Sequence, residues 1–195
     1  MDKMSAPSHR AFSLVELLVV IAIMALLIAA AVPALSSVAQ GSNLNRAGQM
    51  VGDQITQARL TAVSRNREVQ VRLYELTNGL DSGWRGLQVW RMEQSATGSI
   101  GVPASRLLLL PEGVLIEPDR SPLLDADATV AGVENLPSRG SVNYRGFRFR
   151  PNGAMSAGVS ASNNYLTLRP VREGGGNYYT VQVDPLTGKT TVYRP

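Results

Sequence analysis

The chain opens with an almost uninterrupted apolar run. Residues 12–35 form a stretch of 24 positions in which Glu16 carries the only charge. As a helix rising about 1.5 Å per residue, this run would be about 36 Å long, enough to cross a hydrocarbon core of about 30 Å. Most of its residues favour helix, and Pro33 comes late, where it kinks a helix without ending the span. The pattern therefore predicts a transmembrane helix over residues 12–35.

Charged residues around this run are distributed unevenly. Lys3, His9 and Arg10 precede it, whereas no Lys or Arg follows it until Arg46. Because basic residues stay on the cytoplasmic side, the short N-terminus is expected in the cytoplasm and everything after residue 35 on the opposite side of the membrane. The charges therefore predict a single membrane crossing.

Three interpretations of the run differ in how they account for Glu16. A cleaved secretory signal would use the small residues Ser37 and Ala39 as its cleavage site, although signal cores span only about 7–15 residues. A plain anchor leaves Glu16 unexplained, because an acidic side chain at mid-bilayer costs about 2.5–3.5 kcal/mol. The third interpretation gives Glu16 a partner of opposite charge within the membrane.

Past residue 35 the helix is predicted to continue over residues 36–64 with one apolar face. Positions between the apolar ones are mostly polar, as on a helix with one buried side. Gly41, Gly48 and Gly52 weaken this helix, each by up to about 1 kcal/mol relative to Ala. The apolar stripe recurs at spacings of three and four and consists of Leu44, Ala47, Val51, Ile55, Ala58 and Ala62.

From residue 65 to residue 195 the pattern changes to a period of two. Val69, Val71 and Leu73 alternate with polar neighbours, which predicts a half-buried strand. Further strands are predicted over residues 86–92, 106–110, 113–117, 142–150, 165–170, 177–183 and 190–194, with a long loop over 118–141. The predicted fold class is α+β, with a long N-terminal helix packed on a mostly antiparallel sheet.

Composition excludes most catalytic chemistry. The 195 residues include no cysteine and a single histidine, His9. The formal net charge of the chain is +4. Without His or Cys after residue 11, the chain lacks Ser–His triads, Cys nucleophiles and the usual zinc ligands. Asp125 and Asp127 lie two apart, but they do not complete a calcium-loop pattern. The protein is expected to be neither an enzyme nor dependent on a cofactor or metal.

The N-terminal stretch "AFSLVELLVVIAIMALLIAAAVP" resembles the start of type IV pilins and type II secretion pseudopilins. In that family a basic leader ends in a small residue, usually Gly, and Phe, Ser or Thr, Leu, any residue and Glu follow. The resemblance implies that a prepilin peptidase cleaves between Ala11 and Phe12 and methylates the new amine of Phe12. Residues 1–11 would be the leader peptide, with Ala11 in place of Gly. Pro33 falls where pilins commonly carry a helix-kinking proline.

The same resemblance implies a role for Glu16 in filament assembly. In such filaments the helices form a core away from water, where the amine of Phe12 in one subunit would pair with Glu16 of a neighbour. Two charges that are each costly alone would neutralise one another and set the axial register. The implied partners are the prepilin peptidase, other pilin or pseudopilin subunits, the inner-membrane assembly platform and membrane lipid. The implied location is the inner membrane, with residues 65–195 in the periplasm, and then the pilus or pseudopilus.

The C-terminal part narrows the resemblance. "FRFRPNGAMSAG", "YLTLRP" and "YYTVQVDPLTGKTTVYRP" resemble the minor pseudopilins of the GspH and FimT type. In that group an F-x-P-x-G element precedes two strands, and a T-G-K/R turn closes the last hairpin. The matching residues are Phe149, Pro151 and Gly153, then Thr187, Gly188 and Lys189. Gene-cassette pilin-like proteins of the Verrucomicrobia type share this layout.

The sequence is compatible with two functions. One is a minor structural subunit of a type II secretion pseudopilus or a type IV pilus. The alternative is a DNA-binding minor pilin that acts in DNA uptake, because clustered cations suit phosphate capture. The possible DNA-binding residues are Arg145, Arg148, Arg150 and Lys189, with Arg169, Arg172 and Arg194 nearby in the sequence.

Overall fold

The computed structural model describes residues 13–78, 81–96, 98–125, 130–156, 158–171 and 176–194, with the side chains of 31–40, 78 and 81 left aside. The chain divides into two compact units, Met1–Ala39 and Gln40–Pro195. The boundary between them falls inside one helix, α1 (Leu14–Arg65). The predicted boundary of the leader at residues 1–11 lies outside the described residues.

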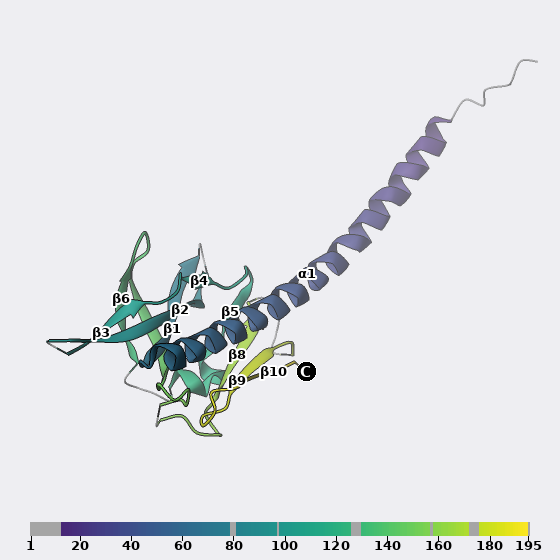
Figure 1. Cartoon of the computed structure of the whole chain (residues 1–195). Coiled ribbons are helices and arrows are strands. Elements are labelled where there is room, and N and C mark those ends of the chain that lie inside the picture. The colour runs from purple at the N-terminus through teal and green to yellow at the C-terminus, as the bar shows by residue number, and fades with distance from the viewer. Residues whose placement is uncertain are drawn as a thin grey trace, which may run out of the picture. The chain divides into compact units, whose positions relative to one another are not determined.

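The second unit is dominated by one antiparallel sheet (Figure 1). Its path runs β10-β9-β8-β5-β2-β1-β7-β6, and β3 and β4 pair with β2 outside this path. The strands are β1 (Val69–Asn78), β2 (Asp81–Ser95), β3 (Gly98–Pro103), β4 (Leu108–Leu109), β5 (Val114–Ile116), β6 (Ala131–Leu136), β7 (Gly140–Phe149), β8 (Tyr165–Pro170), β9 (Tyr179–Val183) and β10 (Thr190–Tyr193). Two 3-10 turns, η1 (Pro118–Arg120) and η2 (Pro122–Leu124), lie between β5 and β6. The α+β class is confirmed.

The predicted apolar stripe of α1 is the helical side of the core. All six stripe residues, Leu44, Ala47, Val51, Ile55, Ala58 and Ala62, are fully buried. They share one hydrophobic cluster with inward-facing residues of β1, β7, β8 and β9. The helix and the sheet therefore bury a single common face, as the spacing of three and four requires.

The close approach of α1 to the sheet depends on a missing side chain at Gly48. A Cβ atom built at Gly48 would lie 2.1 Å from Cε1 of Tyr179, whose side chain is itself buried. At Gly52 the nearest atom, Cγ1 of Val192, would lie 3.6 Å away, an ordinary contact. Gly48 therefore has a packing role that its low helix propensity does not reveal.

The helix ends in a left-handed cap. Asn66 has a φ of 49°, and its N–H bonds to the carbonyl of Val63 at 3.3 Å. The N–H of Arg67 reaches back to the carbonyl of Ala62 at 3.2 Å. These two bonds satisfy carbonyls that the helix end leaves open, and Asn tolerates the left-handed conformation better than most residues.

Several sequence predictions need correction in the middle of the chain. The predicted loop over 118–141 is wrong for residues 131–136, which form β6 and pair with β7, and for residues 140–141, which begin β7. The strand predicted over 86–92 extends over Asp81–Ser95, β3 was not predicted, and the strand over 106–110 is reduced to Leu108–Leu109. β3 lies outside the sheet path and β6 lies at its end. Backbone pairing with a neighbouring strand holds both in place, although neither has an alternating apolar pattern.

The face of β1 that was expected to be polar is also covered. Gln70 and Arg72 are 6% and 7% exposed, respectively. The Arg72 guanidinium lies 4.2 Å from the centre of the Trp90 ring and 4.5 Å from that of Tyr144. It donates to Glu134 of β6 at 2.6 Å. Stacking on two rings and pairing with Glu134 allow the Arg72 cation to be buried. Strand β1 is thus buried on both faces.

Candidate functional site

The first candidate site is the start of α1. Glu16 lies in the first turn of α1, the end of the helix at which the helix dipole favours a negative charge. The described side chains from Ser13 to Ala30 are exposed in the isolated chain, and nearly all are apolar. Ala11 and Phe12 lie outside the described residues, and so does the side chain of Pro33, whose backbone is helical. Within the part of the chain that the structure describes, no helix has both the length and the hydrophobicity needed to span a bilayer.

The second candidate site is the set of arginines on and around β7. Register with β1 places Arg145 opposite Leu73 and Arg148 opposite Gln70. Because neighbouring positions of a strand point to opposite faces, Arg145 and Arg148 project from opposite faces of β7. The alternation therefore separates two cations that are close in the sequence.

Both of these arginines are paired with carboxylates. Arg145 Nη1 lies 2.7 Å from Oδ1 of Asp125, and Arg148 Nη1 lies 3.0 Å from Oε1 of Glu68. Arg169 pairs in the same way with Glu117 at 3.0 Å. Each pair neutralises a positive charge that phosphate contacts would otherwise use. Arg172 lies outside the described residues.

Arg150 and Lys189 are exposed and flank two turns that meet. The turn after β7 contains Gly153 and the turn before β10 contains Gly188, both with positive φ. A Cβ atom at Gly188 would lie 2.2 Å from the carbonyl oxygen of Gly153 and 2.8 Å from Cδ of Arg59 on α1. The glycines of the F-x-P-x-G and T-G-K elements thus allow both turns to close over the same helical side chain.

The second of these turns is organised by Asp184. Its Oδ1 accepts from the backbone N–H of Thr187 at 2.7 Å, from the Thr187 hydroxyl at 2.8 Å and from the N–H of Leu186 at 3.0 Å. The bond from the Thr187 N–H contributes most to lowering the pKa of Asp184 below its ordinary value, because these donors favour the charged carboxylate. The arrangement is a structural cap rather than a reactive centre.

A buried polar network that the sequence did not reveal lies on the outer face of the sheet. Trp90 Nε1 donates to the Tyr74 hydroxyl at 2.8 Å, and this hydroxyl donates to Oε1 of Gln88 at 3.3 Å. Burial raises the pKa of Tyr74 to about 12. In the sequence, the signal for this network was the aromatic content of β1 and β2.

Among the residues that the structure describes, no group of His, Cys, Asp or Glu could hold a metal ion.

Two protein-family profiles match the sequence. The profile of the prokaryotic N-terminal methylation motif matches residues 7–32. The profile of type II transport protein GspH matches residues 49–187, which is more than half of the chain. The chain belongs to the GspH family. The resemblance seen in the sequence is thereby confirmed.

GspH-family proteins are structural subunits, so this chain is a minor pseudopilin or pilin and not an enzyme. Its methylation motif and its family imply a prepilin peptidase and other pilin subunits as partners.

Two solved structures are similar to this GspH-family chain. One is the minor pseudopilin EpsH from the type 2 secretion system of Vibrio cholerae, at 11% identity and a TM-score of 0.45, covering 78% of this chain and 98% of that one. The other is the type IV minor pilin FimU of Pseudomonas aeruginosa, at 15% identity and a TM-score of 0.41, covering 79% and 89% respectively. No curated protein matches the sequence.

Proposed function

We propose that the chain is a minor subunit that residues 12–35 anchor in the inner membrane, with residues 65–195 in the periplasm before assembly. A prepilin peptidase cleaves between Ala11 and Phe12 and methylates Phe12, and the processed subunit enters a type II secretion pseudopilus. A type IV pilus is the alternative filament. The supporting observation is the exposed apolar surface all around the start of α1, with one carboxylate in its first turn.

This surface needs a non-aqueous environment on every side. Leu14 is 80% exposed and Leu26 is 74% exposed, and the large apolar residues between them are 38–69% exposed. A helix that is apolar all round is stable in lipid or among other helices, and not in water. Membrane lipid before assembly and neighbouring subunits afterwards provide these two environments in turn. The assembly platform is the expected partner at the moment of transfer.

Glu16 is the residue that makes assembly specific in this proposal. Its carboxylate pairs with the methylated amine of Phe12 in a neighbouring subunit. Burial of either charge without its partner costs several kcal/mol. This cost is similar to the loss of stability when a mutation removes one partner of a buried ion pair. The pair therefore forms only in the correct axial register.

DNA uptake finds less support than subunit assembly. Arg145 and Arg148 project from opposite faces of β7 and are paired with carboxylates, so the sequence cluster does not form one basic surface. Arg150 and Lys189 remain exposed, but two cations are a small share of what phosphate binding at physiological salt requires.

Substitution of Glu16 tests the proposal in the native host. Glu16→Leu should leave membrane insertion and leader cleavage intact and reduce incorporation into filaments at least tenfold, because the neighbour's amine loses its partner. Glu16→Gln should show a similar but milder defect. Val15→Leu is the matched control, since it changes a neighbouring exposed side chain without changing charge. Normal incorporation of Glu16→Leu at matched membrane abundance would refute this role.

A further inference from the structure

Three segments of the chain meet at the C-terminal end of α1. A Cβ atom at Gly153 would lie 3.1 Å from Cγ2 of Val63, so the turn after β7 lies against the end of the helix. A Cβ atom at Gly188 would lie 2.2 Å from the carbonyl oxygen of Gly153, so the turn before β10 lies against the turn after β7. Arg67, between α1 and β1, lines a cavity of about 470 Å³ together with Pro151. These contacts join the three segments into one end of the sheet unit.

The exposed side chains of this end, which we call the α1-end surface, are mostly cationic. They are Val63, Arg65, Arg67, Arg150, Leu186 and Lys189. Within the described part of the chain, none of the four cations among them forms an ion pair. The nearby carboxylates are already engaged, because Glu68 pairs with Arg148 at 3.0 Å and Oδ1 of Asp184 accepts from the donors of its own turn. The α1-end surface therefore carries positive charge that its own segments do not neutralise.

Large aliphatic side chains lie among these cations. Leu186, in the turn before β10, is 84% exposed, and Val63 is 48% exposed beside the turn after β7. Leu60 precedes Val63 by one helical turn on the same side of α1 and is 57% exposed. Single exposed apolar residues are ordinary. Several of them among arginines match the composition of protein–protein interfaces, which have an apolar centre and a polar rim and are enriched in arginine.

We propose that the α1-end surface docks an acidic face of a different subunit of the same filament. This inference rests on the proposed function, because it takes the partner to be a filament subunit. Carboxylates of the partner pair with the four cations, and its apolar side chains contact Leu186 and Val63. Complementary charge of this kind steers association and fixes the orientation of the two proteins. A second copy of this chain suits the surface poorly, because it has a formal net charge of +4.

Two other kinds of anionic partner suit these side chains less well. Binding of DNA at physiological salt depends on many phosphate contacts and gives the exposed Leu186 and Val63 no apolar partner. Anionic lipid is typically bound by one basic segment beside a membrane helix, whereas these cations come from three separate segments. An acidic protein face with an apolar centre uses both the charge and the aliphatic side chains.

Site-specific photo-cross-linking of the full chain in its native host tests this surface. A photoreactive phenylalanine analogue replaces Leu186, and in a separate strain it replaces Val133 of β6. Val133 is the control position because it is also apolar and 65% exposed but lies at the opposite end of the sheet path from β10. Mass spectrometry identifies the peptide joined to each position. The expected product joins position 186 to a different filament subunit, at a segment with more Asp and Glu than Lys and Arg.

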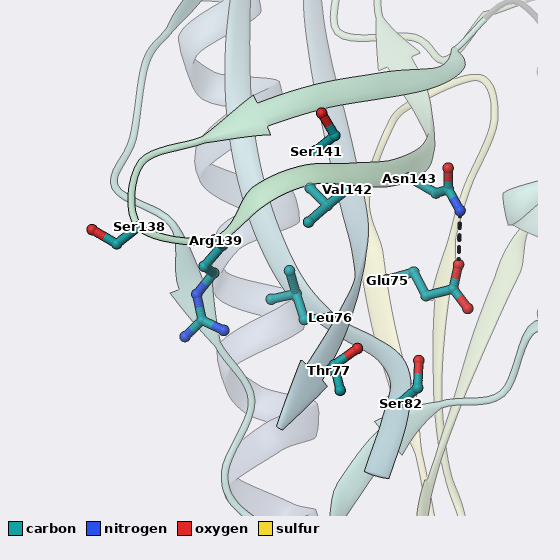
Figure 2. A pocket seen from close by; sticks show the side chains of 9 residues that line it. All are labelled: Glu75, Leu76, Thr77, Ser82, Ser138, Arg139, Ser141, Val142 and Asn143. Atoms are coloured by element: carbon teal, nitrogen blue, oxygen red, sulfur yellow. Dashed lines mark hydrogen bonds between the residues drawn. The ribbon is translucent and has the colours of Figure 1, made fainter. Parts of the chain in front are cut away.

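Charge reversal distinguishes electrostatic docking from chance proximity. Arg67→Glu combined with Lys189→Glu should lower the yield of this product at least tenfold at equal membrane abundance, because like charges would then face each other. Arg139→Glu is the matched control, since Arg139 is exposed and lies on the β6–β7 turn beside another cavity (Figure 2). This control should leave the yield unchanged. Replacement of the partner's cross-linked carboxylates by lysine should restore the product in the double variant.

Several outcomes would overturn the proposal. Position 186 would then give no more product than position 133, or its products would contain only lipid, nucleic acid or a second copy of this chain. These outcomes need no charge variant, so they decide the question even if the double variant fails to fold. Filament incorporation is measured in the same cells. Normal incorporation without the product overturns the docking surface alone, whereas absence of the protein from filaments overturns the proposed function and the docking surface with it.

Discussion

Replacement of Gly48 by alanine tests the packing of α1 on the sheet. In an exposed helix this change stabilises by about 0.5–1 kcal/mol, because alanine loses less backbone entropy. Here the new Cβ would lie 2.1 Å from Cε1, 2.2 Å from Cδ1 and 2.5 Å from Cζ of Tyr179. One edge of the Tyr179 ring therefore occupies the position, and Tyr179 is only 7% exposed, so the ring has little room to move.

The expected magnitude follows from these opposing effects. Overpacking of a core costs about 1–3 kcal/mol, and a clash with three ring atoms belongs in the upper part of that range, about 2–3 kcal/mol. After a gain of about 1 kcal/mol in helix propensity, a net loss of about 1–2 kcal/mol remains. In a protein of this size 1 kcal/mol corresponds to a change of about 2–4 °C in Tm. Gly48→Ala should therefore lower Tm by about 2–8 °C.

Gly52→Ala is the matched control on the same helix. Its new Cβ would meet Val192 at 3.6 Å and Thr190 at 3.8 Å, which are ordinary contacts. This variant should gain about 0.5–1 kcal/mol from helix propensity alone. Thermal unfolding of the full chain, followed by tryptophan fluorescence, measures both, because Trp84 and Trp90 are buried in the sheet unit.

A double-mutant cycle identifies the cause of the loss. If the Tyr179 ring is responsible, Gly48→Ala combined with Tyr179→Ala should be less destabilising than the sum of the two single changes. A Gly48→Ala variant that melts at or above Gly52→Ala would refute the reasoning. Strict additivity in the cycle would also refute it, since the two residues would then be independent.

Three further predictions concern charged groups. Arg72→Ala should lower the free energy of unfolding by about 2–4 kcal/mol in urea titrations, since it removes a stacked and paired buried cation, whereas the control Arg91→Ala, in a partly exposed pair, should cost less than about 1 kcal/mol. The pKa of Asp184 is lowered in the folded state, so its ionised carboxylate stabilises the fold. This contribution to the free energy of unfolding is complete above the pKa of the unfolded state, about 3.9, and is lost as the pH falls through the pKa of the folded state. The Tm difference between the parent protein and Asp184→Ala should therefore be constant near neutral pH and disappear in acid. Fluorescence anisotropy with a labelled DNA duplex at about 150 mM salt should show no saturable binding, and binding that Arg148→Gln weakens would contradict this expectation.

Most of the helix and much of the sheet could be predicted from the sequence. The stripe from Leu44 to Ala62 was identified correctly because a helix that buries one face must repeat apolar residues at spacings of three and four. Strand β8 (Tyr165–Pro170) was predicted with its observed bounds, because apolar and polar residues alternate along it. The methylation motif and the GspH-like turns were also readable, because they depend on residue identity at fixed spacing.

Strands at the margins could not be predicted, for a physical reason. β6 has one buried residue, Leu136, and β3 has none, so neither shows the alternation of a half-buried strand. Their backbones are satisfied by pairing with β7 and β2, and this pairing leaves no local pattern in the sequence.

By itself the sequence determined the fold class, the position of the helix face and the family, because each is encoded in local spacing and residue identity. Only the tertiary structure decided which charges are free. Arg145 and Arg148 are close in sequence, but strand alternation sends them to opposite faces and to different carboxylates. Arg85 has no feature in the sequence that marks it as buried, but in the structure it is the extra residue of a β-bulge and is 8% exposed. Partners of a charged group are set by long-range strand pairing, and that information is absent from any short stretch of the chain.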